Sequence, residues 1–400
     1  MEKIKASNRT IIWILGSLST VTPFAIDLYL PAFASIASDF KTNTATISLS
    51  VSSYFIGMAI GQILYGPFLD RYGRKRPLYV GLFIFILASF GCMQSWNVTS
   101  LITFRFFQAL SGSVAWVGAV AMVRDFFPVK ESARVFSLLF LIIGVSPLLA
   151  PTVGGFIVTE FGWHAIFIGL SGITTGILIV VYFFLPEGHQ PDPTISLRAK
   201  PMLLTFHDII KNPLFSKYAF AGAFSFSTLF IYVAGSPIIF MEMYQVSPKI
   251  YGLIFALLSV GFIGGGQVNI QLTKKFDSQK IFRAALIAQV VAGFVFLTGV
   301  IGDWLGLYGT IVFFFICLSC IGLINPNGNA LALSPFTRTV GSASALLGCI
   351  QIGLASLVSF GVGLFNAADA IPIVALMTIT SSIALLIILR NKHLPVASAD

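Results

Sequence analysis

Long apolar stretches recur along the whole chain, separated by short polar segments. We count twelve of them, and each is close to the roughly 20 residues that a helix needs to cross the hydrocarbon core of a bilayer. They cover residues 10–34, 46–69, 77–95, 98–123, 134–158, 164–185, 214–241, 249–272, 281–301, 305–332, 340–365 and 370–389. The pattern predicts an all-α membrane protein with twelve transmembrane helices. The first stretch is too long for a signal-peptide core, so we expect it to be retained.

One polar segment, residues 185–213, is much longer than the others. It contains LPEGHQPDPTISLRAKP, which is rich in proline and charge and typical of a connector. The two halves on either side of it show a weak internal sequence repeat. GPFLDRYGRKR at 66–76 follows the second span, and QLTKKFDSQK at 271–280 follows the eighth, at the corresponding position. Paired six-helix bundles are a recurring transporter plan with a midplane substrate site. The predicted domains are an N-terminal six-helix bundle, a cytoplasmic linker and a C-terminal six-helix bundle, at residues 1–185, 186–213 and 214–400.

Positive charge is concentrated on one side of the predicted spans. If the N-terminus is cytoplasmic, 21 of the 24 lysines and arginines fall on the inner side. The exceptions are Lys41 and Lys249 outside and Arg105 within a span. This asymmetry follows the positive-inside rule and predicts that both termini are cytoplasmic. Topology therefore explains the net charge of +9, and we expect no nucleic-acid partner.

Composition points away from a soluble enzyme. Hydrophobic residues make up 56% of the chain and charged residues only 10%, against about 25% charged residues in a soluble domain. The four cysteines are Cys92, Cys317, Cys320 and Cys349, and all lie within or at the end of predicted spans. The CxxC spacing of Cys317 and Cys320 lacks a second Cys or His pair, which favours packing over metal binding. We expect no catalytic cluster, no metal and no cofactor.

Two charged residues lie well inside predicted spans, away from the span ends. Asp27 is the only one of the fifteen acidic residues placed well inside a span, and Arg105 is the only basic residue placed similarly. A charge at the bilayer centre costs at least about 2.5–3.5 kcal/mol. Asp27 and Arg105 should lie about 13 Å and about 10 Å below the outer ends of their helices, so they share a depth. We predict that Asp27 carries a proton and that Arg105 is its electrostatic partner; a structural ion pair is the alternative.

The string GPFLDRYGRKR at residues 66–76 is the most specific motif. It resembles the GxLxDRxGRRxxL signature of the major facilitator superfamily, with Phe68 at the usual leucine. The span count and the division into halves extend this resemblance to the whole chain. We expect Asp70 to meet the positive end of the eleventh helix and to latch the halves on the inner side. For residues 74–76 an alternative explains the sequence equally well: they are solvated basic residues that only set the orientation of the helices in the membrane. The candidate latch residues are Gly66, Asp70, Arg71, Gly73 and Arg74.

Two further strings indicate which group within the superfamily the chain resembles. RFFQALSG at 105–112 resembles the RxxQGxGaA motif of proton-coupled members, with Ala109 where glycine is usual. GVSPLLAPTVGG at 144–155 resembles the helix-five antiporter motif GxxxxGPxxGG, with Ala150 replacing a glycine. Prolines one turn apart with small neighbours allow a kink and close helix packing. This resemblance implies antiport rather than symport. The candidate antiporter-helix residues are Gly144, Pro147, Pro151, Gly154 and Gly155.

The string DLYLP at residues 27–31 resembles the DxYLP of the Bcr/CflA branch of drug:proton antiporters. Members of that branch export bicyclomycin, chloramphenicol and similar compounds. The strings FIYVAGSP at 230–237 and GSASALLG at 341–348 agree with this resemblance. The usual GWRWIF appears as GWHAIF at 162–167, which puts any salt bridge made by its arginine in doubt.

Aromatic and amide residues within the spans are the candidate substrate contacts. Tyr54 should lie near the depth of Asp27, and Gln108 lies within one turn of Arg105. Packing is the alternative for each aromatic, and bonding between helices is the alternative for each amide. The predicted substrate contacts are Tyr29, Tyr54, Gln108, Phe226, Phe230, Tyr232, Asn325 and Gln351. We expect proton handling to be confined to the first half.

The sequence therefore predicts a monomeric, multi-pass antiporter of the cell inner membrane that exports small, largely apolar molecules in exchange for protons, and so could confer antibiotic resistance. Its partners would be the small-molecule substrate, protons and the lipid bilayer. Three alternatives stay open: a dedicated exporter of one metabolite such as a siderophore or amino-acid derivative, a proton symporter, and a sensor that keeps the transporter shell. A membrane-embedded enzyme is disfavoured because no catalytic cluster is present.

Overall fold

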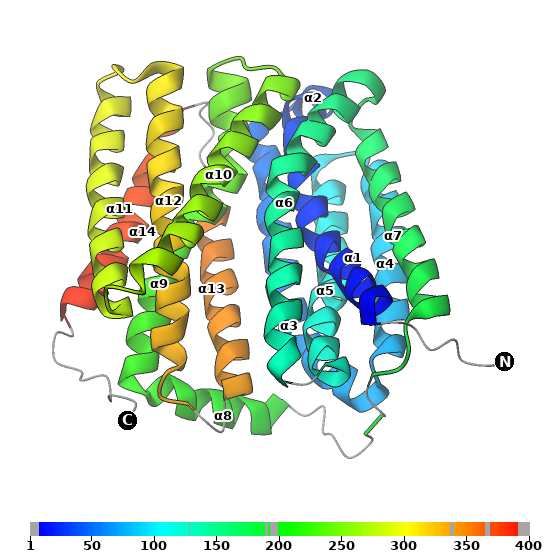
Figure 1. Ribbon diagram of the computed structural model, residues 1–400. Helices are drawn as coiled ribbons and strands as arrows, with labels where there is room; N and C mark the ends of the chain where they lie inside the picture. Colours follow the sequence, from blue (N-terminus) through cyan, green and yellow to red (C-terminus); the bar gives the residue numbers. More distant parts are fainter. Residues whose placement is uncertain are drawn as a thin grey trace. The chain divides into compact units, whose positions relative to one another are not determined.

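A computed structural model describes residues 8–127, 129–188, 191–192, 199–336, 340–364 and 369–390. Within these ranges the chain forms helices and turns, and no strand (Figure 1). Twelve helical segments in the described ranges are long and apolar enough to cross a membrane. The prediction of an all-α, twelve-span membrane protein is confirmed. The cytoplasmic placement of the termini stays a prediction.

Most helices begin and end within a few residues of the predicted spans. In chain order they are α1 (Asn8–Asp27), the 3₁₀ helix η1 (Leu30–Ala32), α2 (Phe33–Asp39), α3 (Thr44–Tyr72), α4 (Lys75–Met93), α5 (Val98–Phe126), α6 (Val129–Phe161), α7 (His164–Phe184), α8 (Ala199–Lys211), α9 (Pro213–Pro237), the π-helix η2 (Ile238–Met243), α10 (Pro248–Leu272), α11 (Ser278–Ile301), α12 (Gly306–Leu333), α13 (Val340–Val362) and α14 (Ala370–Arg390).

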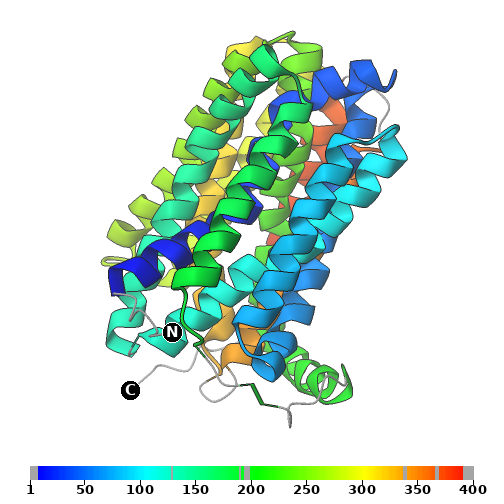
Figure 2. The ribbon, with the colours of Figure 1, turned by 90° about the vertical axis from the view of Figure 1, so that its right-hand side faces the viewer.

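Helix contacts divide the chain into two compact units. The first unit consists of Met1–Leu197 and Ser247–Ala256, so it contains α1 to α7 and the first turns of α10. Inside it, α3 and α4 both pack along α5, α4 also packs on α7, and α1 lies against α5 and α6. Figure 2 shows α4 and α5 of this unit, in blue and cyan, running side by side along their length.

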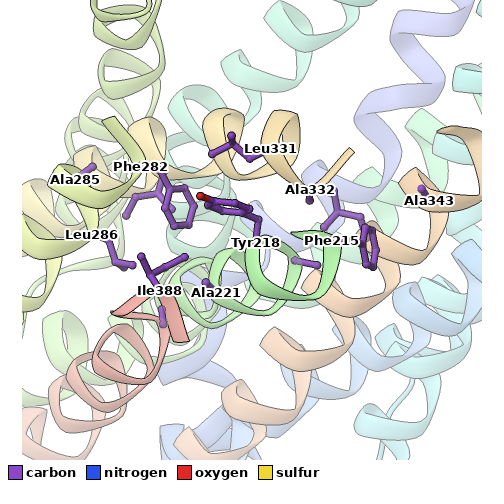
Figure 3. Close-up of a cluster of buried hydrophobic side chains, with 14 of the residues drawn as sticks. Phe215, Tyr218, Ala221, Phe282, Ala285, Leu286, Leu331, Ala332, Ala343 and Ile388 are labelled. Carbon is purple, nitrogen blue, oxygen red and sulfur yellow. The ribbon is translucent and has the colours of Figure 1, made fainter. Parts of the chain in front are cut away.

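The second unit consists of Arg198–Val246 and Leu257–Asp400. Its central helix is α9, around which α12, α13 and α14 pack, while α11 packs on α12 and α14. At one end of α9, Phe215 and Tyr218 enter a buried apolar cluster with Phe282 of α11 and Leu331 of α12 (Figure 3). The rings of Tyr218 and Phe282 meet edge to face at 5.5 Å. Such a pair adds about 0.5–1.5 kcal/mol beyond the burial of its area.

The first predicted span is broken rather than continuous. Helix α1 ends at Asp27, and the chain resumes as η1 and α2. Pro31, which has no amide hydrogen to donate to a preceding carbonyl, lies in the first turn of η1. The backbone adapts at this point, because the Leu28 amide still reaches the Phe24 carbonyl whereas the Tyr29 amide bonds one residue nearer, to Ile26. The break places Asp27 at a helix terminus.

Part of the predicted connector is helical. Helix α8 lies within residues 186–213, where the sequence reading expected no element, and it runs across the ends of α9 and α13 (Figure 1). Ile209 is buried in the apolar cluster of the second unit, and Phe206 packs against that cluster. The spacing of these two residues, three positions apart, was the available signal for an amphipathic helix.

Candidate functional site

Asp27 is the last residue of α1, and only 6% of it is exposed. Ser146 of α6 donates a hydrogen bond from its hydroxyl to Asp27 Oδ2 over 3.2 Å. Within the described part of the chain, no basic side chain forms an ion pair with Asp27. The carboxyl group is therefore shielded from water, with a hydroxyl partner and no countercharge.

The predicted antiporter motif packs directly against the segment that carries Asp27. A Cβ atom on Gly154 would collide with the carbonyl oxygen of Leu28, the residue that follows Asp27. A Cβ atom on Gly155 would collide with the carbonyl oxygen of Pro248 at the start of α10. These two glycines therefore let backbones touch on two sides of α6. The motif's remaining residues also lie on α6: Gly144, Pro147 and Pro151.

Arg105 is fully buried within α5 and is bound without a carboxylate. Its Nη1 atom donates to the carbonyl oxygen of Ala25 at 3.0 Å and to Oε1 of Gln108 at 2.6 Å. Gln108 in turn donates to the hydroxyl of Ser89 on α4 at 2.7 Å. Among the described residues, the Nε and Nη2 atoms of Arg105 find no hydrogen-bond partner. The guanidinium group therefore keeps unused donors in an interior where they are costly to bury.

Two tyrosine rings flank the same guanidinium group. Its Cζ atom lies 4.5 Å from the ring centroid of Tyr29 and 4.2 Å from that of Tyr54. Cation–π contacts of this kind contribute about 2 kcal/mol when desolvated. The Tyr29 hydroxyl bonds Ser50 at 2.8 Å. Both rings are buried, so the faces of Tyr29 and Tyr54 take the place that a carboxylate would otherwise fill.

Asp27 and Arg105 are linked through the backbone of α1. Arg105 binds the carbonyl of Ala25, two residues before Asp27. The sequence reading left direct pairing of the two charges open, and the described residues show this carbonyl contact instead of an ion pair. Arg105 therefore fixes the last turn of α1 while leaving the Asp27 carboxyl group uncompensated.

Three of the candidate latch residues, Asp70, Gly73 and Arg74, lie at the junction of α3 and α4. Arg74 Nη1 lies 2.6 Å from Asp70 Oδ1, and Arg74 also makes a two-pronged contact with Asp125 of α5, at 2.7 Å and 3.2 Å. The side chains of Arg74 and Asp125 are 8% and 13% exposed, against 47% for Asp70. Burial alone lowers the pKa of Arg74, but its bonds to Asp125 and Asp70 raise that pKa above its usual value. Arg74 thus stays charged in this cluster.

A third carboxylate closes the cluster from the segment that follows α7. Glu187 Oε1 accepts hydrogen bonds from the backbone amides of Arg74, at 2.5 Å, and Lys75, at 3.2 Å. These amides belong to the N-terminus of α4, where a negative group is favoured. Gly73 turns the chain there with a φ of 81°, which suits glycine. Of the other two candidates, Arg71 has its Cζ atom 5.9 Å from the Tyr72 ring centroid, and a Cβ on Gly66 would meet no described atom within 4 Å.

Five predicted substrate contacts lie in the second unit. On α9, the rings of Phe226 and Phe230 pack at a tilt with centroids 5.4 Å apart, and the buried Tyr232 ring lies 5.2 Å from that of Phe314. Gln351 of α13 donates from Nε2 to Asn325 Oδ1 of α12 at 3.3 Å. The remaining three predicted contacts, Tyr29, Tyr54 and Gln108, all belong to the Arg105 cluster.

Sequence reasoning missed several partners of these residues. Ser146 lies inside the quoted antiporter string, between Gly144 and Pro147, but hydroxyls are too common in helices to single it out. Asp125 and Glu187 lie at the inner ends of the fourth and sixth predicted spans, where charges were read as topology. Their contacts with Arg74 depend on three segments far apart in sequence, which no local pattern reveals.

Comparisons with known proteins agree with this arrangement. The family model described as "Major Facilitator Superfamily" matches residues 15–360. The chain is 33% identical to an uncharacterized MFS-type transporter YdgK of Bacillus subtilis, covering 93% of this chain and 92% of that protein. It is 30% identical to a bicyclomycin resistance protein homolog of Haemophilus influenzae, covering 92% of each. It is 28% identical to the multidrug resistance protein MdtL of Escherichia fergusonii, covering 91% of this chain and 94% of that protein.

Solved structures share the fold at low sequence identity. A D-xylose–proton symporter superposes with a TM-score of 0.74 at 16% identity, covering 98% of this chain and all of that chain. A bacterial homologue of the human lysosomal transporter Spinster gives a TM-score of 0.71 at 13% identity, covering 96% of each. With its twelve apolar helices the protein is a multi-pass inner-membrane transporter rather than an enzyme. The chain belongs to the Major Facilitator Superfamily, and its relatives are consistent with the Bcr/CflA branch.

Proposed function

We propose that the protein is a proton-coupled efflux antiporter that exports small, largely apolar compounds across the inner membrane by alternating access. The observation that carries this proposal is Asp27: a buried carboxyl group at a helix end, hydrogen-bonded to Ser146 and with no ion-pair partner in the part of the chain that the structure describes. The names of two relatives, a bicyclomycin resistance protein homolog and a multidrug resistance protein, support drug-like substrates.

The coupling step follows from the surroundings of Asp27. A charge in the membrane interior is costly unless it is paired or hydrated. Because no cation neutralises Asp27, its proton occupancy depends on whether water or substrate reaches it. Opening of the site on the proton-rich side would load a proton, and opening on the other side would release it. Substrate and proton would compete for the space beside Asp27, which produces exchange.

Arg105 would act as a positioning residue in this scheme. It binds the Ala25 carbonyl and is flanked by Tyr29 and Tyr54, so its contacts hold the final turn of α1 in place. The Arg74 cluster would control the rate of the alternating-access change, because it ties together the inner ends of α3, α4 and α5.

Transport by purified protein in liposomes tests the proposal. With an imposed pH gradient, the wild-type protein should move chloramphenicol against its concentration gradient, in the direction opposite to protons. Asp27→Asn keeps the size and polarity of the side chain and should abolish gradient-driven transport while leaving the protein folded. Asp303→Asn is the matched control, since Asp303 is exposed and its positive φ of 53° suits asparagine.

Transport by Asp27→Asn at the wild-type rate would contradict the assignment. Movement of substrate in the same direction as protons would indicate symport. A panel of unrelated ligands in the same assay separates a multidrug exporter from an exporter dedicated to one metabolite.

A further inference from the structure

We propose that a groove between α8, α9 and α14 binds an acidic phospholipid, with the lipid phosphate against Lys211 and Lys217 and an acyl chain against Phe220 and Phe224. The groove has a volume of about 450 Å³, and all of its described lining residues belong to the second unit. Ile210 of α8 and Ile387 of α14 form its apolar sides. This inference does not depend on the proposed transport function.

The groove follows one face of α9. Lys217, Phe220 and Phe224 line it and recur every three or four positions, so they lie in a row along the helix. The opposite face of α9 enters the apolar cluster of the second unit through Phe215 and Tyr218 (Figure 3). Phe220 and Phe224 are only half-buried, although α9 is a membrane-spanning helix. Lipid tails are as apolar as these side chains, so an acyl chain fits this face.

The lining changes from basic to apolar along α9. The helix begins at Pro213, so Lys217 lies near the end of the membrane span. Phe224 lies seven residues further along the helix, about 10 Å deeper at 1.5 Å per residue. A phospholipid has the same order, because its charged headgroup lies at the surface of the bilayer and its acyl chains lie below. A free phosphate ion would use only the basic end of the groove.

Positive charge gathers at the basic end. Lys211 is the last residue of α8, and Lys217 is 7% exposed, with its Nζ atom 5.5 Å from the ring centroid of Tyr218. Arg283 of α11 is near enough for its like charge to repel that of Lys217. None of the described lining residues is acidic. A phosphate group would offset the repulsion and accept charge-assisted hydrogen bonds from the lysine ammonium groups.

The location of these cations agrees with a lipid headgroup. Lys211, Lys217 and Arg283 are among the basic residues that the positive-inside rule assigns to the cytoplasmic side. Basic pockets between spanning helices on that side bind acidic headgroups such as that of cardiolipin. Helix α8 is held at this level because Ile209 is buried in the apolar cluster of the second unit. The fold therefore fixes Lys211 beside the start of α9.

Native mass spectrometry of the purified full-length protein in detergent tests the site. The probes are dioleoylphosphatidylglycerol, which is acidic, and dioleoylphosphatidylcholine, which has the same chains and no net charge. The wild-type protein should retain phosphatidylglycerol in preference. Lys211→Gln and Lys217→Gln should each weaken phosphatidylglycerol binding about fivefold and leave phosphatidylcholine binding unchanged. Phe220→Ala should weaken both lipids alike. Lys274→Gln is the matched control, since it removes an exposed lysine of the second unit from the same predicted side.

Equal retention of the two lipids by the wild-type protein would overturn the proposal, as would the wild-type preference in Lys211→Gln. A loss in Lys274→Gln as large as in Lys211→Gln would also overturn it, because surface charge in general would then explain the binding. Displacement of phosphatidylglycerol by millimolar inorganic phosphate would show that the groove takes a free anion instead of a lipid. Monodisperse elution shows that each variant is folded, and the exposed Lys211 keeps the test decisive if Lys217→Gln does not fold.

Discussion

Replacing Asp125 with alanine should destabilise the protein much more than replacing Asp70, although both carboxylates bind Arg74. The Arg74 and Asp125 side chains are 8% and 13% exposed, so they form a buried, two-pronged ion pair. Removing one partner of a buried pair costs about 3–5 kcal/mol. Because Arg74 would keep its contact with Asp70, we expect the lower end of that range for Asp125→Ala.

Asp70 has a different environment, since 47% of its side chain is exposed. An exposed ion pair contributes about 0–1 kcal/mol, and Arg74 would keep both bonds to Asp125 in Asp70→Ala. The free energy of unfolding can be measured by titration with dodecyl sulfate in mixed micelles, with helicity as the readout. Double-mutant cycles with Arg74→Gln would then isolate the two pairwise energies. A loss for Asp70→Ala that equals or exceeds the loss for Asp125→Ala would refute this reasoning.

Three further predictions concern transport. Asp70→Asn should slow turnover without changing which ligands are accepted, because Asp70 belongs to the Arg74 cluster and not to the substrate contacts; unchanged turnover in liposomes would contradict this. Gly154→Ala should impair transport because its Cβ would collide with the Leu28 carbonyl, whereas Gly169→Ala, with no atom within 4 Å, should transport normally. Exchange of a neutral substrate for protons carries net positive charge into the compartment that the substrate leaves. Moving one elementary charge across a membrane potential of 100 mV changes the free energy by about 2.3 kcal/mol. A potassium diffusion potential at equal pH should therefore drive export, and insensitivity to that potential would argue against a neutral substrate.

Much of the fold was accessible from the sequence because the bilayer imposes simple rules. Apolar length alone identified all twelve spans found in the described residues. The exceptions depend on local chemistry within those spans. Pro31 ends α1 early, and a hydropathy window does not register one proline. Helix α8 is amphipathic rather than uniformly apolar, so it was read as part of a connector.

The candidate site was predictable at the level of single residues but not of contacts. Asp27 and Arg105 stand out in the sequence because charge is rare in a span. Their actual partners, Ser146 for Asp27 and the Ala25 carbonyl for Arg105, are ordinary groups that no pattern marks. The same holds for Asn329, which forms a shorter bond to Gln351 than the predicted Asn325 does. Neutral groups acquire a role only from the neighbours that the fold brings to them.

Proton release by the detergent-solubilised protein on addition of chloramphenicol, followed with a pH indicator in weak buffer, is the most direct test of the central claim. The account predicts release by the wild-type protein and by Asp303→Asn, and none by Asp27→Asn, which has no titratable carboxyl group at that position. Release of as many protons by Asp27→Asn as by the wild type would show that another group carries the proton.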